Sequence, residues 1–164
     1  VYENGLFSGT DSRSFSPNAS MTRAMLVTVL YRLEGEPTVT GRSSFTDVRS
    51  GAYYEKSVIW AAANGIVTGT DSTSFSPDAK VTREQLAAIL YRYAQYRKLD
   101  TDASAKLNSF TDADSVSAYA SEALGWAVSE GLINGASGKL MPKGDATRAQ
   151  VAAILHRFVE NVMD

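Results

Sequence analysis

Residues 64–77 read NGIVTGTDSTSFSP, and residues 81–92 read VTREQLAAILYR. Residues 4–17 repeat the first segment as NGLFSGTDSRSFSP, with TR and LYR following in the same places, so the pattern recurs at a shift of 60 residues. A looser third copy, residues 130–157, keeps the glycines, the proline and the Thr-Arg pair. Such self-similarity indicates one supersecondary unit used three times. A function is therefore expected once per repeat or once per junction between repeats.

The composition is that of an ordinary globular protein. Of 164 residues, 44% are hydrophobic and 21% are charged, and the formal net charge is −2. These values argue against disorder and against a general attraction to nucleic acid. Apolar stretches such as residues 86–90 are far shorter than the roughly 20 residues of a membrane helix, so no membrane insertion is expected. The absence of cysteine excludes disulfides, thiolate nucleophiles and cysteine-based zinc sites.

The repeats divide the chain into residues 1–38, 39–99 and 100–164, which we expect to form one folded unit. By the shift of 60 residues Val1 corresponds to Ala61, so the first repeat has only its C-terminal half. Residues 1–9 lack the basic start and apolar stretch of a signal peptide. The sequence is therefore interpreted as the C-terminal part of a longer protein.

Each complete repeat is predicted to hold a helix, a loop and a second helix. In the second repeat the first helix is expected over residues 53–64, with Gly65 as a left-handed stop. A loop with Phe75 as its apolar anchor follows, and Thr82 with Gln85 then forms a capping box. The third repeat has the same plan, with helices expected from about residue 119 to residue 129 and from Thr147 with Gln150.

The first repeat keeps the loop and the second helix, with Thr22 as cap and Met25 in place of the box partner. The chain is thus predicted to be all-α. The apolar stripes of such small helix pairs need partners, which three pairs around a common axis would supply. A linear array of helical hairpins is the alternative architecture.

Arginine follows the capping threonine in all three repeats, as Arg23, Arg83 and Arg148. A cation in the first turn opposes the helix dipole, so three such placements need a reason. One interpretation pairs each arginine with an aspartate of the Phe-Thr-Asp turn, Asp47 or Asp112. The other places the guanidinium beside free helix N–H groups, as an anion-binding corner for a carboxylate or phosphate.

Glycines and tryptophans also recur at matching places. Gly9, Gly69 and Gly135 could bring the backbone close to a ligand, or could only satisfy turn geometry. Trp60 and Trp126 could form a sugar platform, although a buried core role is favoured.

Signatures of catalysis and of metal binding are weak. His156 has no counterpart in the other repeats and is predicted to lie on a helix surface. The loop around Asp71 has too few carboxylates for a calcium loop of the helix–loop–helix kind. We therefore predict no catalytic constellation, no metal and no cofactor.

Four segments together resemble the S-layer homology domain, repeated as a triplet. They are FTDV at residues 45–48, WAAANGIVTG at 60–69, FSP at 75–77 and VTRE at 81–84. The resemblance covers nearly the whole chain. It implies a pseudo-threefold spindle, in which one helix of each repeat joins a central three-helix bundle while the other helix and loop form prongs. It also implies an extracellular module that holds a surface protein on the bacterial cell wall without a covalent bond.

The resemblance implies that the ligand is secondary cell-wall polysaccharide, often pyruvylated, in grooves between prongs. The family's Thr-Arg-Ala-Glu motif falls on residues 22–25, 82–85 and 147–150, and its glutamate is absent from all three. The candidate ligand-binding residues are Arg23, Arg83, Arg148, Gly9, Gly69, Gly135, Trp60, Trp126, Asp47 and Asp112.

Two other functions stay open at this stage. One is a protein-interaction or self-assembly module of a surface layer, associating through the incomplete first repeat. The other, least favoured, is an envelope enzyme such as a glycan hydrolase, because the sequence offers no carboxylate pair or triad. The prediction is a non-enzymatic anchor.

Overall fold

The structure is a computed structural model that describes residues 19–102, 105–135 and 137–163. Within these ranges the chain is helical, and extended pairing is limited to isolated bridges, which confirms the all-α prediction. The helices are α1 (Arg23–Leu33), α2 (Glu55–Ala63), α3 (Arg83–Tyr96), α4 (Ser121–Ser129) and α5 (Arg148–Phe158). Shorter helical turns are η2 (Ala113–Ser115), η3 (Ala118–Ala120) and the π-helical η4 (Val159–Met163).

The predicted caps form as expected. Thr82 and Thr147 each make a full capping box with the glutamine three residues on, whereas Thr22 accepts only the amide of Met25. Gly65 follows α2 at a φ of 71°, a left-handed conformation that glycine adopts without steric cost. The first helices of the repeats start later than predicted: α2 begins at residue 55, and α4 begins at residue 121, directly after η3.

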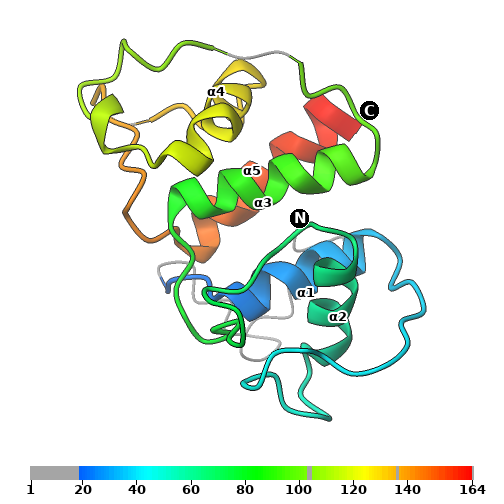
Figure 1. Cartoon of the computed structure of the whole chain (residues 1–164). Coiled ribbons are helices and arrows are strands. Elements are labelled where there is room, and N and C mark those ends of the chain that lie inside the picture. The colour runs from blue at the N-terminus through cyan, green and yellow to red at the C-terminus, as the bar shows by residue number, and fades with distance from the viewer. Residues whose placement is uncertain (1–18, 103–104, 136, 164) are drawn as a thin grey trace.

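Helices α1, α3 and α5 run in the same direction, with their N-terminal ends gathered on one side (Figure 1). A closed ring of backbone hydrogen bonds joins the residues just before these helices. The amide of Met21 donates to the carbonyl of Ala146 (3.0 Å), Ala146 to Val81 (2.9 Å) and Val81 to Met21 (2.8 Å). Each repeat thus bonds to both others, which confirms the threefold arrangement and excludes the linear hairpin array.

The prong helices α2 and α4 pack across repeat boundaries. Helix α2 of the second repeat packs on α1 of the first, and α4 of the third packs on α3 of the second. The sequence predicted a helix, a loop and a second helix in each repeat, but it did not specify which helices pack together. The long loop between α2 and α3 carries the chain away from α2, so α2 buries its apolar face against the preceding repeat.

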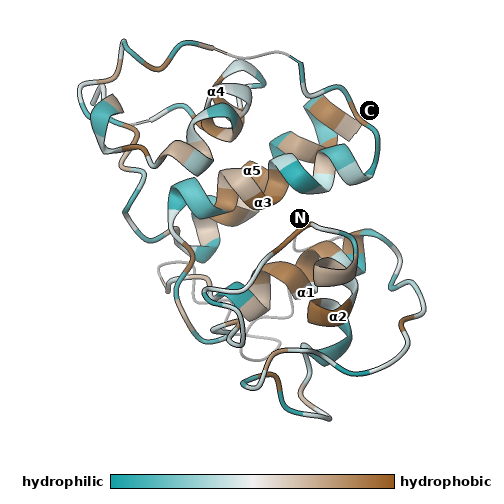
Figure 2. Cartoon of the chain, in the orientation of Figure 1, coloured by the Kyte–Doolittle hydropathy of each residue, from teal (hydrophilic) through white to brown (hydrophobic). Residues whose placement is uncertain are grey.

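Aromatic rings fill the space between the central helices and the prongs, and apolar residues line the faces where helices meet (Figure 2). Trp60 of α2 contacts Tyr31 of α1 and Tyr93 of α3, with ring centroids 5.6 and 6.2 Å apart. Trp126 of α4 contacts Tyr91 of α3 and Phe158 of α5, at 5.5 and 6.2 Å. Each prong helix therefore bridges two central helices through one tryptophan.

Candidate functional site

The first amides of the central helices donate hydrogen bonds to loops from other repeats. The amides of Arg23 and Ala24 donate to the carbonyls of Ala79 and Pro77, each at 2.9 Å. At α3 and α5 the Arg83 and Arg148 amides donate in the same way to Gly144 and Ala19, at 3.0 and 2.8 Å. The anion-binding corner built on free helix N–H groups is therefore wrong, because protein carbonyls already accept from these amides.

Asp47 and Asp112 hold the glycine loops in place rather than pairing with arginine. The Asp47 carboxylate accepts from the amides of Phe75 and Ser76, both at 2.8 Å. Asp112 accepts from Leu140 and Met141 at the same distance, and these hydrogen bonds, that from Leu140 above all, lower the pKa of its carboxyl.

Among the described residues, no ion pair joins Arg23 or Arg83 to Asp47 or Asp112, a pairing that one interpretation of the sequence predicted. The ion pairs within the described ranges are Arg97–Glu34, Lys143–Glu84 and His156–Glu160. His156 is exposed on the surface of α5, as predicted.

The loop glycines stand where no other residue fits. A Cβ on Gly69 would lie 2.4 Å from the Ser74 carbonyl oxygen and 2.6 Å from the Phe45 ring. A Cβ on Gly135 would lie 2.7 Å from the Lys139 carbonyl oxygen, and its φ is 76°. The glycines thus serve the turn itself and its packing on the phenylalanine of the Phe-Thr-Asp turn. Gly9 lies outside the described residues.

The three arginines reach into neighbouring segments. Arg23 is 6% exposed, and its Nε and Nη2 donate to the carbonyls of Phe75 (2.9 Å) and Thr68 (2.8 Å) in the loop of the second repeat. Arg83 is less buried and donates to Gln150 Oε1 at 3.0 Å. Arg148 is 8% exposed, and its Nη2 lies 3.6 Å from the sulfur of Met25.

Two of these arginines line equivalent grooves between repeats. The first groove, of about 390 Å³, is lined by Arg23, Val67, Thr68, Gly69, Thr70, Gln85, Ala88, Ile89, Arg92 and Tyr119. The second groove, of about 230 Å³, is lined by Arg83, Leu132, Ile133, Asn134, Gly135, Leu140, Met141, Ala146, Gln150, Ala153, Ile154 and Arg157. In both, an arginine of one repeat faces the glycine loop and second helix of the next.

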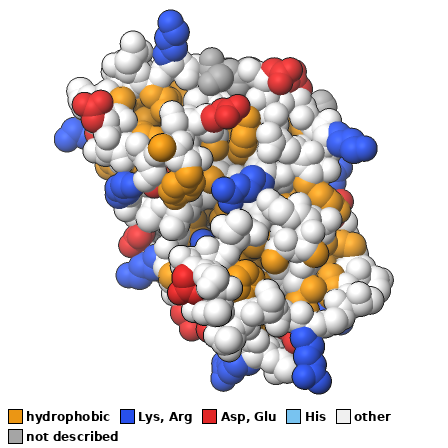
Figure 3. Space-filling model, in the orientation of Figure 1, with side chains coloured by type: hydrophobic (Ala, Val, Ile, Leu, Met, Phe, Trp, Pro, Cys, Tyr) orange, Lys and Arg blue, Asp and Glu red, His pale blue; other side chains and the backbone are white. Residues whose placement is uncertain are grey.

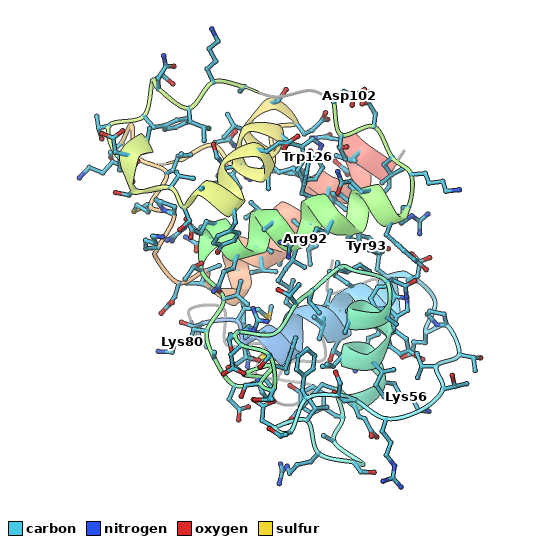
Figure 4. The ribbon with its side chains drawn as sticks, viewed as in Figure 1. Lys56, Lys80, Arg92, Tyr93, Asp102 and Trp126 are labelled. Atoms are coloured by element: carbon cyan, nitrogen blue, oxygen red, sulfur yellow. The ribbon has the colours of Figure 1, made fainter. Side chains whose placement is uncertain are left out.

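Each groove holds a second arginine that was not predicted as a site residue. Arg92 ends the Leu-Tyr-Arg segment of the second repeat, and Arg157 ends the matching Leu-His-Arg segment of the third, so the recurrence of this arginine in the sequence was the available signal. Arg92 lies on α3 at the centre of the face viewed in Figure 4. Basic side chains lie in the middle of this face with hydrophobic side chains beside them (Figure 3). An elongated ligand with acidic groups and apolar ring faces would match such a surface.

Trp60 and Trp126 line neither groove. They are 3% and 0% exposed, and Figure 4 shows Trp126 between α4 and α5. The expectation that they bind sugar does not fit this burial, and the core role explains their recurrence.

Comparison with known proteins decides the family. The S-layer homology domain matches residues 1–24, 44–87 and 109–152, which together exceed half of the chain. The chain belongs to the S-layer homology domain family. The three matches also follow the three repeats of the sequence, although the first is shorter, with residues 1–24 against 44 residues in each of the others.

The protein is similar to a surface-layer 125 kDa protein of Lysinibacillus sphaericus, with 32% identity over 99% of this chain and 14% of that protein. An endoglucanase of Bacillus sp. (strain KSM-635) is 32% identical over 99% of this chain and 17% of the enzyme. The S-layer protein sap of Bacillus anthracis is 26% identical over 94% of this chain and 19% of that protein. The chain thus spans less than a fifth of the length of each of these relatives.

These relatives place the S-layer homology protein at the bacterial cell surface and support anchoring there. The endoglucanase matches only through its S-layer homology region, which is an anchoring module. In the part of the chain that the structure describes, no helix is long and apolar enough to cross a membrane. The same residues hold no group of three or more His, Asp or Glu side chains arranged for a metal ion.

Proposed function

We propose that this protein anchors a larger surface protein to the cell wall by binding secondary cell-wall polysaccharide in the grooves between its repeats. The polysaccharide is expected to carry acidic substituents such as pyruvate ketals. Binding is noncovalent and needs no cofactor.

The observation that carries the proposal is the repeated groove with two arginines. In the first groove Arg23 and Arg92 face the segment 67–70, and in the second Arg83 and Arg157 face the segment 132–135. Arginine is the side chain best suited to bidentate binding of a carboxylate. Two such sites on one module would raise retention on a repetitive polymer through effective concentration, even if each site is weak.

Co-sedimentation with cell walls tests this function. The purified chain is expected to pellet with bacterial wall sacculi that keep their polysaccharide and to stay in solution with sacculi stripped of it. Free polysaccharide should release the bound protein in proportion to its concentration. Equal pelleting with stripped sacculi would contradict the proposal and would point to peptidoglycan or to self-association, which sedimentation of the protein alone would reveal.

A further inference from the structure

One arginine of the first groove, Arg23, already bonds to other parts of the protein. Arg23 is almost fully buried, donates two hydrogen bonds to loop carbonyls and stacks on the Phe75 ring, with its Cζ 4.7 Å from the ring centroid. Burial is the main cause that lowers the pKa of its guanidinium; Tyr119 and Asp47 partly offset this effect, and the charge of Arg92 adds to it. The main role of Arg23 is therefore to fix the loop that forms the groove wall.

Arg92 lines the same groove but does not hold a loop in place as Arg23 does. It follows Gln85 by seven residues and Ala88 by four, so these residues lie on one face of α3. Among the described residues, no hydrogen bond or ion pair joins Arg92 to another side chain or carbonyl. The lining of the first groove includes no aspartate or glutamate in the described part of the chain. A second positive charge is thus held at the groove without a compensating carboxylate in its lining.

Tyr119 supplies an aromatic wall to this groove. It belongs to η3 at the base of the third repeat's prong and is 53% exposed, although it lines the groove. Burial of part of the side chain, together with the nearby Glu84 carboxylate, raises the pKa of Tyr119 to about 12, so the phenol stays neutral. An exposed tyrosine ring offers an apolar face and a polar edge, the combination that suits a pyranose ring.

The same combination recurs at α1, where Tyr53 is the counterpart of Tyr119. Tyr53 is 66% exposed and lines a smaller hollow with Thr28 and Arg32, which are the counterparts of Ala88 and Arg92. The second groove differs, because its described lining contains no tyrosine and Arg157 donates to the carbonyl of Leu132 at 3.2 Å. Of the two grooves, the first therefore has the side chains better suited to bind an acidic sugar.

We infer that Arg92 and Tyr119 form the recognition pair of the first groove for an acidic sugar residue: Arg92 binds its carboxylate and Tyr119 packs on its ring. This inference rests on the proposed function and goes further by assigning the contacts. It makes Arg23 a positioning residue and makes the prong of the third repeat part of a site whose loop belongs to the second. The first groove then binds more tightly than the second.

Calorimetric titration with a monosaccharide bearing a pyruvate ketal tests the assignment, beside co-sedimentation of the same variants with intact sacculi. The Arg92→Gln substitution is expected to weaken binding of the ketal sugar tenfold or more. It should not change the weak binding of the same sugar without the ketal. Tyr119→Ala should weaken binding of both sugars, and Tyr119→Phe should restore most of the lost affinity, because the ring remains. Arg42→Gln removes an equal charge from an exposed loop and is the matched control.

The outcomes separate the two proposals. If the wild-type protein binds wall polymer while Arg92→Gln and Tyr119→Ala bind as well as it does, the recognition pair is overturned and the anchoring function stands. If the wild-type protein binds neither the ketal sugar nor intact sacculi, both proposals fall. Amide chemical shifts give a second readout: the ketal sugar should perturb Gly69 at lower concentration than Gly135, and the reverse order would contradict the ranking of the grooves.

Discussion

At the scale of single residues, the contacts of Arg23 explain why an arginine is tolerated directly after the capping threonine. A cation in the first turn of a helix is repelled by the positive end of the dipole. For Arg23 the carbonyl oxygens of Thr68 and Phe75 accept from the guanidinium, and other loop carbonyls accept from the first helix amides. The loop of the second repeat therefore accepts hydrogen bonds both from the first amides of α1 and from the charged guanidinium of Arg23. This places the recurrent arginine at the joint between repeats, beside the groove.

Gly69 gives a prediction at this scale. Gly69→Ala should lower the free energy of unfolding by about 3 kcal/mol, because the added methyl would meet two backbone carbonyl oxygens at 2.4 and 2.5 Å and the loop would have to shift. Urea unfolding followed by circular dichroism measures the change. The same displacement should weaken binding to sacculi, since Gly69 lines the first groove.

Ser72→Ala is the control for this prediction, because Ser72 is exposed in the same loop. Its effect is expected to stay within about 0.5 kcal/mol, as for ordinary surface substitutions. Equal stability of the two variants would mean that the loop is not packed against Phe45 as the structure describes.

At the scale of elements, Glu84 distinguishes α3 from the other central helices. Alanine stands at the equivalent positions of α1 and α5, whereas Glu84 is 3% exposed and joins three elements. Its carboxylate accepts from the amide and hydroxyl of Ser117, at 3.0 and 2.6 Å, and from Lys143 at 3.1 Å. These bonds fix η3, and therefore Tyr119, relative to the first groove.

Glu84 predicts a dependence of stability on pH. Burial raises the pKa of this carboxyl, but the bonds from Ser117 and Lys143 outweigh burial, so the folded pKa lies below its ordinary value. The stabilisation is then complete above the unfolded pKa and is lost as the pH falls through the lower, folded value. Glu84→Gln should cost about 2 kcal/mol near pH 7. The difference from wild type should shrink as the pH falls below the ordinary pKa of a glutamate carboxyl, as measured by urea unfolding.

Asp114→Asn is the matched control, because Asp114 is an exposed carboxylate for which the described residues provide no hydrogen-bond partner. It should leave stability nearly unchanged at every pH. A Glu84→Gln deficit that does not change with pH would indicate lost packing instead of lost charge.

Local chemistry made part of this structure predictable. Thr82 with Gln85 and Gly65 after α2 specify helix ends through bonds within a few residues, so the sequence alone predicted them. The recurrence of Arg23 and Gly69 likewise pointed to the first groove. The contacts of Glu84 with Ser117, and of Tyr119 with a groove of another repeat, join residues that are far apart in the chain, and no local pattern encodes them. Trp60 was ambiguous because its recurrence at Trp126 does not show whether the indole is buried or exposed to a ligand.

At the scale of the whole molecule, closure of the repeats into a ring changes how stability is shared. In a linear repeat array each unit contacts only its neighbours, so an end unit can be removed at limited cost. Here the third repeat accepts from the first at Ala146 and supplies the carbonyls of Gly144 and Pro142 to the start of α3. Its Trp126 and Phe158 also cover the rings of Tyr91 and Tyr93. The three repeats are therefore expected to fold as one cooperative unit.

Removal of the third repeat tests this cooperativity. A fragment of residues 1–99 should show no cooperative thermal transition by circular dichroism, because the start of α3 loses its loop partners and its apolar face loses the prong helix α4. Amide exchange should be fast in α1 as well as in α3, although α1 keeps its own prong helix α2. Addition of a fragment of residues 100–164 should restore protection in both helices if the ring re-forms. A fragment 1–99 that melts cooperatively near the temperature of the intact chain, with α1 still protected, would show that the repeats stand independently and that the ring of backbone bonds contributes little.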